Sequence, residues 1–162
     1  MPATPSTDQV WEEIKKQVFA VLGFVSRNGE ARTAGICYVV QGQELFIATG
    51  RTSWKTRHIE GNPNVSLTVT IPKRIPLLPW IKIPPATVTF QGRATVCGVE
   101  EISGEIQRSL LRSLELDPDT RKKTCIIRVT PSGEFVTYGV GVPLLTMKHP
   151  EQARGRAPVA RA

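Results

Sequence analysis

Two segments of this chain alternate apolar and polar residues with a period of two, and this pattern constrains the fold more than any other feature. In residues 65–71, valine, leucine and isoleucine alternate with serine and threonine. In residues 86–96, alanine, valine and phenylalanine alternate with threonine, glutamine and arginine. Such alternation is typical of strands with one buried face, and antiparallel sheets commonly leave the other face in solvent. The pattern therefore predicts two antiparallel strands.

Further segments rich in strand-forming residues are bounded by turn signals. They are 18–26, 31–40, 44–49, 124–130 and 134–140. The pair Asn28-Gly29 predicts a hairpin between the first two segments, and Pro131-Ser132-Gly133 predicts a second hairpin between the last two. Because these strands do not alternate with long helices, they favour a mainly β chain with minor α content, built as a small antiparallel barrel with short helices at its ends.

Three helices are expected beside the strands. Ser6 and Gln9 form a capping-box pattern ahead of an amphipathic segment. Apolar residues at helical spacing predict a longer helix over 101–116, which should stop before Asp117-Pro118 because proline restricts the preceding residue. A short helix is expected between Ser53 and Gly61.

The chain has 162 residues, which is sufficient for one domain with its own core. Its apolar runs are too short to span a bilayer, and the first residues lack a signal pattern, so we expect a cytoplasmic protein. The three cysteines Cys37, Cys97 and Cys125 are widely spaced, which predicts reduced thiols in the core and no zinc site. No metal is expected.

Positive charge is concentrated in two segments. The proline-rich segment 72–85 and the tail 148–162 account for six of the seven net positive charges. The body of the chain is therefore nearly neutral, which argues against a nucleic-acid-binding face. We interpret 1–147 as a single domain that contains 72–85 as an insertion, and the tail from Pro150 has the composition of a disordered extension.

The insertion carries five prolines, which exclude a helix. Six large apolar residues lie between them, and Lys73, Arg74 and Lys82 flank these residues. Such a stiff segment can cover a ligand groove, clamp a partner subunit, touch an anionic membrane surface or pack on its own barrel. We expect a flap that folds against a dimer near the mouth of the groove.

Residues 48–63 carry the clearest chemistry. A strand ends at Thr49, Thr52 or Ser53 can cap the following helix, and Arg51, Lys55 and Arg57 crowd its start. A helix start offers free N–H groups and a partial positive charge, so this arrangement suits a phosphate. An ordinary capped surface helix with solvated charges fits the same pattern.

Residues 49–67, TGRTSWKTRHIEGNPNVSL, follow the hairpin and strand VFAVLGFVSRNGEARTAGICYVVQGQELFIA. This combination resembles the flavin-binding split-barrel family related to pyridoxamine 5′-phosphate oxidase, over roughly residues 18–99. The resemblance implies an antiparallel split β-barrel of the FMN-binding type. It further implies a homodimer that holds FMN, a related deazaflavin or heme in grooves between two subunits.

The resemblance also implies roles for individual residues. Arg32, Ser53 and Lys55 match phosphate ligands, and Thr49 matches a residue beside the flavin ring. The other cofactor-binding candidates are Gly35, Ile36 and Cys37 under the ring, together with Arg51, Trp54 and Thr87. Three of these depart from the oxidase pattern, because Trp54 replaces an arginine, Thr87 a glutamine and Cys37 a lysine.

The final hairpin offers no Arg-x-His pair of the kind that grips pyridoxamine phosphate, so the oxidase activity itself is not expected. The leading hypothesis is a flavin-dependent oxidoreductase with an unknown small-molecule redox substrate. The alternatives are a flavin- or heme-binding carrier without turnover and a cofactor-free dimeric scaffold. No catalytic residue is assigned, and whether the protein is an enzyme stays open at this point.

Overall fold

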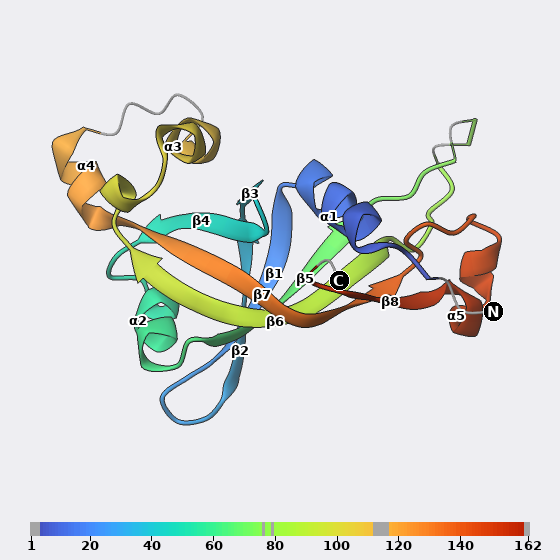
Figure 1. Cartoon of the computed structure of the whole chain (residues 1–162), viewed down its shortest axis with the longest axis horizontal. Coiled ribbons are helices and arrows are strands. Elements are labelled where there is room, and N and C mark those ends of the chain that lie inside the picture. Colours follow the sequence, from blue (N-terminus) through green and yellow to red (C-terminus); the bar gives the residue numbers. More distant parts are fainter. Residues whose placement is uncertain (1–3, 76, 79, 112–116, 161–162) are drawn as a thin grey trace.

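The computed structural model describes residues 4–75, 77–78, 80–111 and 117–160. Within them a curled antiparallel sheet forms the body of the molecule, with short helices at its ends (Figure 1). The strands run in the order β2-β1-β5-β6-β7-β4-β3, and β8 pairs with β7. Their bounds are β1 Phe19–Val25, β2 Ala31–Cys37, β3 Val39–Gln41, β4 Glu44–Gly50, β5 Asn64–Ile71, β6 Ala86–Cys97, β7 Thr124–Tyr138 and β8 Arg154–Pro158. The predicted mainly β, antiparallel class is confirmed.

The helices are short and connect or cap the strands. They are α1 Thr7–Lys16, α2 Trp54–Gly61, α3 Gly104–Leu111, α4 Pro118–Lys123 and α5 Pro150–Ala153, with 3₁₀ turns at Val99–Glu101 and Thr146–Lys148. The capping box of α1 is confirmed, since the Ser6 hydroxyl accepts the Gln9 N–H at 3.2 Å and the Gln9 side chain accepts the Ser6 N–H at 2.9 Å. The hairpin at Asn28-Gly29 is also confirmed, and Gly29 has φ +78°.

The core lies on the inner face of the curled sheet. In β5 the buried side chains are those at odd positions from Val65 to Ile71, as the alternation predicts. The Trp11 ring of α1 meets the buried Phe135 ring edge-on, with centroids 5.3 Å apart. Its indole N–H donates to the Val159 carbonyl at 3.1 Å. Helix α1 thus closes one end of the core and is bonded to the residue that follows β8.

The expected hairpin at 131–133 is wrong, because β7 runs without reversal from Thr124 to Tyr138. Strand β6 pairs with it on both sides of a register shift between Thr89 and Gln91. The turn-forming residues are used at this irregularity, where Gly133 adopts φ +74°. A β-bulge and a turn both require such residues, so composition did not distinguish them.

The expected helix over 101–116 is only partly correct. Residues 104–111 form α3, residues 99–101 form a 3₁₀ turn, and 112–116 lie outside the described residues. Asp117-Pro118 starts α4 as well as preventing a continuous helix, since the Asp117 carboxylate accepts the N–H groups of Asp119 and Thr120. Proline is favoured at the first position of a helix, so the same pair that predicted a helix end also begins the next helix.

The expected disorder from Pro150 is also wrong. Residues 150–153 form α5, and β8 pairs with β7 in a register that places Arg156 opposite Val136. Ala157 and Val159 are buried while the arginines face outward. The tail therefore alternates with period two, but its inward residues are too small to give a strong apolar signal.

Candidate functional site

The end of β4 and the start of α2 are connected by buried hydroxyl groups. The Ser53 hydroxyl accepts the Thr56 N–H at 3.3 Å and lies 2.8 Å from the Thr56 hydroxyl. Thr56 is fully buried and donates to the Gly50 carbonyl at 3.1 Å. These bonds fix the direction of α2 relative to β4. Ser53 is thus the helix cap, and the alternative cap Thr52 is not.

Two cations flank this helix start in different ways. The Arg51 side chain donates to the Lys122 carbonyl at 3.4 Å, so it also holds the end of α4. Lys55 is half-buried and, within the described part of the chain, makes no hydrogen bond or ion pair. The first two N–H groups of α2 have no acceptor inside the helix. Free N–H groups beside an unpaired ammonium can bind an anion.

The electrostatic effect of these cations reaches the sheet below. Burial raises the pKa of the Cys125 thiol, while a hydrogen bond with Thr56 and the charges of Arg51 and Lys55 act in the opposite direction. Cys125 lies under the helix start, paired in register with Thr49. Burial therefore keeps the Cys125 thiol protonated, and the thiol lies beneath Arg51 and Lys55.

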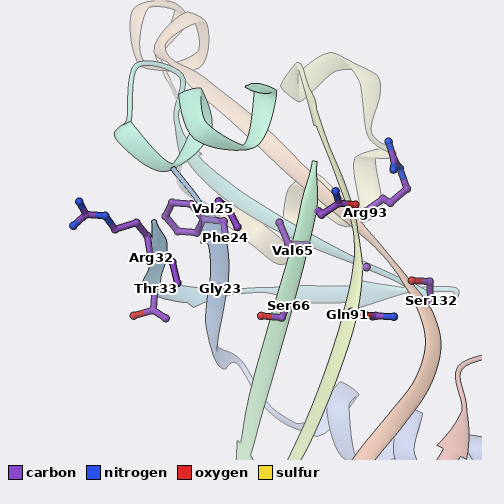
Figure 2. Close-up of a pocket in the computed structure, with 13 residues that line it drawn as sticks. Gly23, Phe24, Val25, Arg32, Thr33, Val65, Ser66, Gln91, Arg93 and Ser132 are labelled. Atoms are coloured by element: carbon purple, nitrogen blue, oxygen red, sulfur yellow. The ribbon is translucent and has the colours of Figure 1, made fainter. Parts of the chain in front are cut away.

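A separate open groove of about 610 Å³ lies on the outer face of the sheet (Figure 2). Its centre is a row of residues across four strands, where Thr33 pairs with Gly23, Gly23 with Ser66, and Ser66 with Gln91. A Cβ at Gly23 would lie 2.5 Å from the Ser66 hydroxyl oxygen. The small residues Gly23 and Ser66 in the middle of this row leave space for the groove.

Arginines stand at two sides of the groove. Arg32 comes from β2 and Arg93 from β6, and both line the groove with Gln91 (Figure 2). The Arg32 guanidinium forms an ion pair with Glu30. None of the described lining residues is acidic, so the groove favours an anionic ligand that Arg93 would attract and that could replace Glu30 at Arg32.

An aromatic cluster joins the groove to the helix start. Phe24 pairs in register with Arg32, and its ring lies 5.1 Å from that of Trp54 and 6.2 Å from that of His58. Trp54 is 46% exposed. The buried Nδ1 atom of His58 has no hydrogen-bond partner among the described residues. Phe24 is buried, so Trp54 is the member of this cluster whose ring is exposed to a planar ligand.

The predicted cofactor-binding residues fall into separate places. Arg51, Ser53, Trp54 and Lys55 come together at the helix start, with Thr49 at the end of β4. Arg32 reaches the groove, and it is the one residue of the predicted set that lines it.

The three residues expected under a flavin ring differ in how accessible their side chains are. The Ile36 side chain is buried in the core, so only its backbone can face a ligand. Gly35 is exposed, and a Cβ there would lie 3.0 Å from the neighbouring Phe19 ring. Cys37 is exposed. The expectation that all three thiols are buried is therefore wrong for Cys37, because its position in β2 faces outward.

Thr87 lies away from both regions. It pairs with Thr70 and Tyr138, four residues along β6 from Gln91. This offset is about 13 Å at about 3.3 Å per residue. The described part of a single chain therefore does not bring Thr87 to the Arg32 groove.

Sequence reasoning missed Ser66, Gln91 and Arg93. Their positions on the polar face of two alternating strands were visible, but such positions are usually solvated. Only the strand register, which places Asn64 opposite Arg93 and Ser66 opposite Gln91, brings them to one groove with Arg32.

The insertion and the helix start lie at opposite ends of β5. Strand β5 starts beside α2 and ends at the insertion (Figure 1). The insertion therefore does not cover this chain's own groove, and docking near the groove of a partner subunit stays a prediction. No helix in the described residues is long and apolar enough to cross a membrane.

Solved structures with the same fold include proteins of different activity. An F420 reductase matches with a TM-score of 0.57 and 19% identity, over 76% of this chain and 93% of its own. A heme storage protein of Vibrio cholerae matches with a TM-score of 0.62 and 17% identity, over 83% of this chain and 95% of its own. A heme binding protein of Mycobacterium smegmatis matches with a TM-score of 0.69 and 13% identity, over 97% of this chain and 60% of its own.

These structural matches are below 25% identity, so they establish the fold alone. A search of the curated proteins finds no match. The family model described as pyridoxamine 5′-phosphate oxidase, in contrast, matches residues 6–136. That range runs from the cap of α1 into β7 and includes both the helix start and the groove. The chain therefore belongs to the pyridoxamine 5′-phosphate oxidase family, and its sheet is that family's split barrel.

Proposed function

We propose that the protein is a cytoplasmic flavin-dependent oxidoreductase that binds FMN or a related deazaflavin as a homodimer. The observation that carries this proposal is the pairing of an anion-binding helix start with an aromatic surface. Lys55 and two free N–H groups suit a phosphate, and the exposed Trp54 ring, which packs on the buried Phe24 ring, provides a face for a planar ring. The donor set therefore fits the phosphate and ring of a flavin.

The chain's own residues would bind and orient the cofactor. Lys55 would pair with the phosphate, and the Arg32 guanidinium at the groove would release Glu30 and pair with an anionic group of the ligand. Because the Thr56 hydroxyl donates to the Gly50 carbonyl, the Ser53 hydroxyl donates to the Thr56 oxygen, and it would exchange that acceptor for a phosphate oxygen. A bound flavin supplies hydride transfer.

The position of Thr87 supports the homodimer. From Arg32, Thr87 is three strands across the sheet and about five residues along it, which is about 20 Å at about 4.8 Å per strand and 3.3 Å per residue. Both residues match cofactor-facing positions of the family. They reach the same cofactor if Thr87 serves the groove of the partner subunit. The exposed Phe19 and Val136 side chains are apolar surface that a partner would cover.

The experiment is a fluorescence titration of FMN with the wild type and with Lys55→Ala. Loss of one charge-assisted bond, worth about 1.5–3 kcal/mol, should raise Kd about ten- to a hundredfold. Arg154→Ala is the matched control, because this exposed cation lies on β8 and should leave Kd unchanged. An unchanged Kd in Lys55→Ala would remove the helix start from the site.

A carrier without turnover is the second candidate. The specific observation that favours it is the lining of the groove, which among the described residues contains no histidine, carboxylate, cysteine or tyrosine. No acid or base therefore faces a ligand there. Mass spectrometry of the co-purifying molecule identifies the cofactor, whether flavin, deazaflavin or heme. Bleaching of the bound flavin by reduced nicotinamide or reduced deazaflavin supports the enzyme, and its absence with both supports the carrier.

A further inference from the structure

The insertion and the segment 144–148 form an exposed apolar surface that we call the apolar tip. Leu77 is 87% exposed, Trp80 72% and Leu145 73%, and Leu78 and Ile81 are also exposed. These residues are five of the nine large apolar side chains that are exposed in the described part of the chain. A water-soluble face rarely gathers so many, so the tip is suited to contact something apolar.

The two segments of the tip pack together as one surface. An open cleft of about 410 Å³ lies between them, lined by Ile75 and Ile83 on one side and Leu144 and Met147 on the other. The second segment is fixed to the sheet, because the Tyr138 hydroxyl donates to the Met147 carbonyl at 2.7 Å. Prolines restrict the first segment. The tip therefore projects from the sheet where β5 ends and β6 begins (Figure 1).

The charged residues of the two tip segments all have one sign. Lys73, Arg74 and Lys82 belong to the insertion, and Lys148 belongs to the second segment. Residues 61–99 and 135–150 contain no aspartate or glutamate. The next acid along the chain, Glu151, lies 3.8 Å from His149. The tip therefore combines exposed leucine and tryptophan side chains with uncompensated positive charge.

We propose that the apolar tip docks on the surface of a lipid bilayer that contains anionic lipids. Tryptophan and leucine side chains enter the boundary between headgroups and acyl chains, and lysine and arginine pair with anionic headgroups. A tip-to-tip contact with a second copy of this chain is disfavoured because it would bring like charges together, and a tip seated elsewhere on a partner subunit is one of the outcomes that the test below separates. Docking at this end leaves the helix start and the Arg32 groove free.

Vesicle co-sedimentation tests the proposal. The full chain should bind vesicles of phosphatidylglycerol and phosphatidylcholine at least about tenfold more tightly than vesicles of phosphatidylcholine alone, and added salt should weaken this binding. Lys73→Glu with Arg74→Glu should lower binding at least about tenfold. Arg27→Glu with Arg108→Glu is the matched control, because it changes net charge equally at exposed sites away from the tip and should leave binding unchanged.

Tryptophan fluorescence locates the contact. Trp11 is buried and Trp54 lies at the other end of β5, so a blue shift on anionic vesicles should disappear in Trp80→Phe and persist in Trp54→Phe. The proposal is overturned if anionic vesicles are not bound, or if neutral vesicles are bound equally well. It is also overturned if Leu77→Ser with Trp80→Ser lowers the oligomeric mass without lipid, because the tip would then be a protein contact.

Discussion

Two groups of cations lie at opposite ends of the β5–β6 pair, and they differ in their surroundings. At the α2 end, Lys55 stands beside free helix N–H groups, and Arg51 is bonded to a carbonyl of α4. At the insertion end, Lys73, Arg74 and Lys82 stand among exposed apolar side chains. The first surroundings suit one small anion, and the second suit an extended anionic surface. Positive charge alone does not distinguish these uses.

The two ends are far enough apart to act independently. The eight residues of β5 separate them by about 23 Å at about 3.3 Å per residue. A ligand of the groove and a surface at the tip can therefore be bound at the same time. A variant at one end should leave the other end's binding unchanged, and this independence can be tested.

Deletion of residues 75–83 should have the largest effect. Five residues would remain between β5 and β6, and loops of this length are common in hairpins. Binding to anionic vesicles should fall at least about a hundredfold, because the exposed apolar side chains and Lys82 are lost. Kd for FMN, measured by fluorescence titration, should not change.

A different result would break the comparison. If the deletion variant keeps its vesicle binding, the tip is not the docking surface. If vesicle binding falls but the cofactor off-rate rises, the insertion also covers the groove of a partner subunit, as the sequence predicts. Dimer mass and melting temperature, measured on the same preparation, show whether the barrel is still folded.

The sequence predicted those parts of the fold that depend on local pattern. Ser6 with Gln9, the turn at Gly29 and the alternation in β5 each act within a few residues, and each was correct. The wrong predictions came from residue patterns that occur in two different local structures. Turn residues at 131–133 support a bulge, and Asp117-Pro118 starts a helix.

The candidate site was less predictable because it depends on register. Ser53 and Lys55 lie close in sequence and were expected at one helix start. Ser66, Gln91 and Arg93 meet Arg32 only through the pairing of four strands, which local pattern does not specify. The same limit applies to the tip, where the insertion meets residues 144–148.

Gly92→Ala should have the next largest effect. It tests how closely β6 and β7 approach each other beside the groove. A Cβ at Gly92 would lie 2.6 Å from the Thr130 carbonyl oxygen and 3.1 Å from the Pro131 Cα atom. These are backbone atoms, so β6 and β7 must separate, which should lower the free energy of unfolding by about 1–3 kcal/mol. Urea denaturation measures this change.

Gly61→Ala is the matched control at the end of α2. A Cβ there would meet no atom within 4 Å, so this variant should gain about 0.4–1 kcal/mol through a more restricted unfolded chain. Equal stability in the two variants would mean that β6 and β7 do not approach as closely as the structure has them.

Replacement of the two helix caps should have the smallest effect on stability. It compares a cap at the proposed phosphate site with a cap elsewhere in the molecule. Ser53→Ala and Ser6→Ala each remove a hydroxyl that accepts an N–H of the third helical residue, so each should lower the free energy of unfolding by about 1 kcal/mol in urea denaturation. Only Ser53 lies at the proposed phosphate site. Ser53→Ala should therefore also raise Kd for FMN, by about two- to tenfold because the bond to the phosphate replaces the existing bond to Thr56, while Ser6→Ala should leave it unchanged. If both variants change Kd equally, the loss reflects general destabilisation, and the α2 end is a capped helix without an anion.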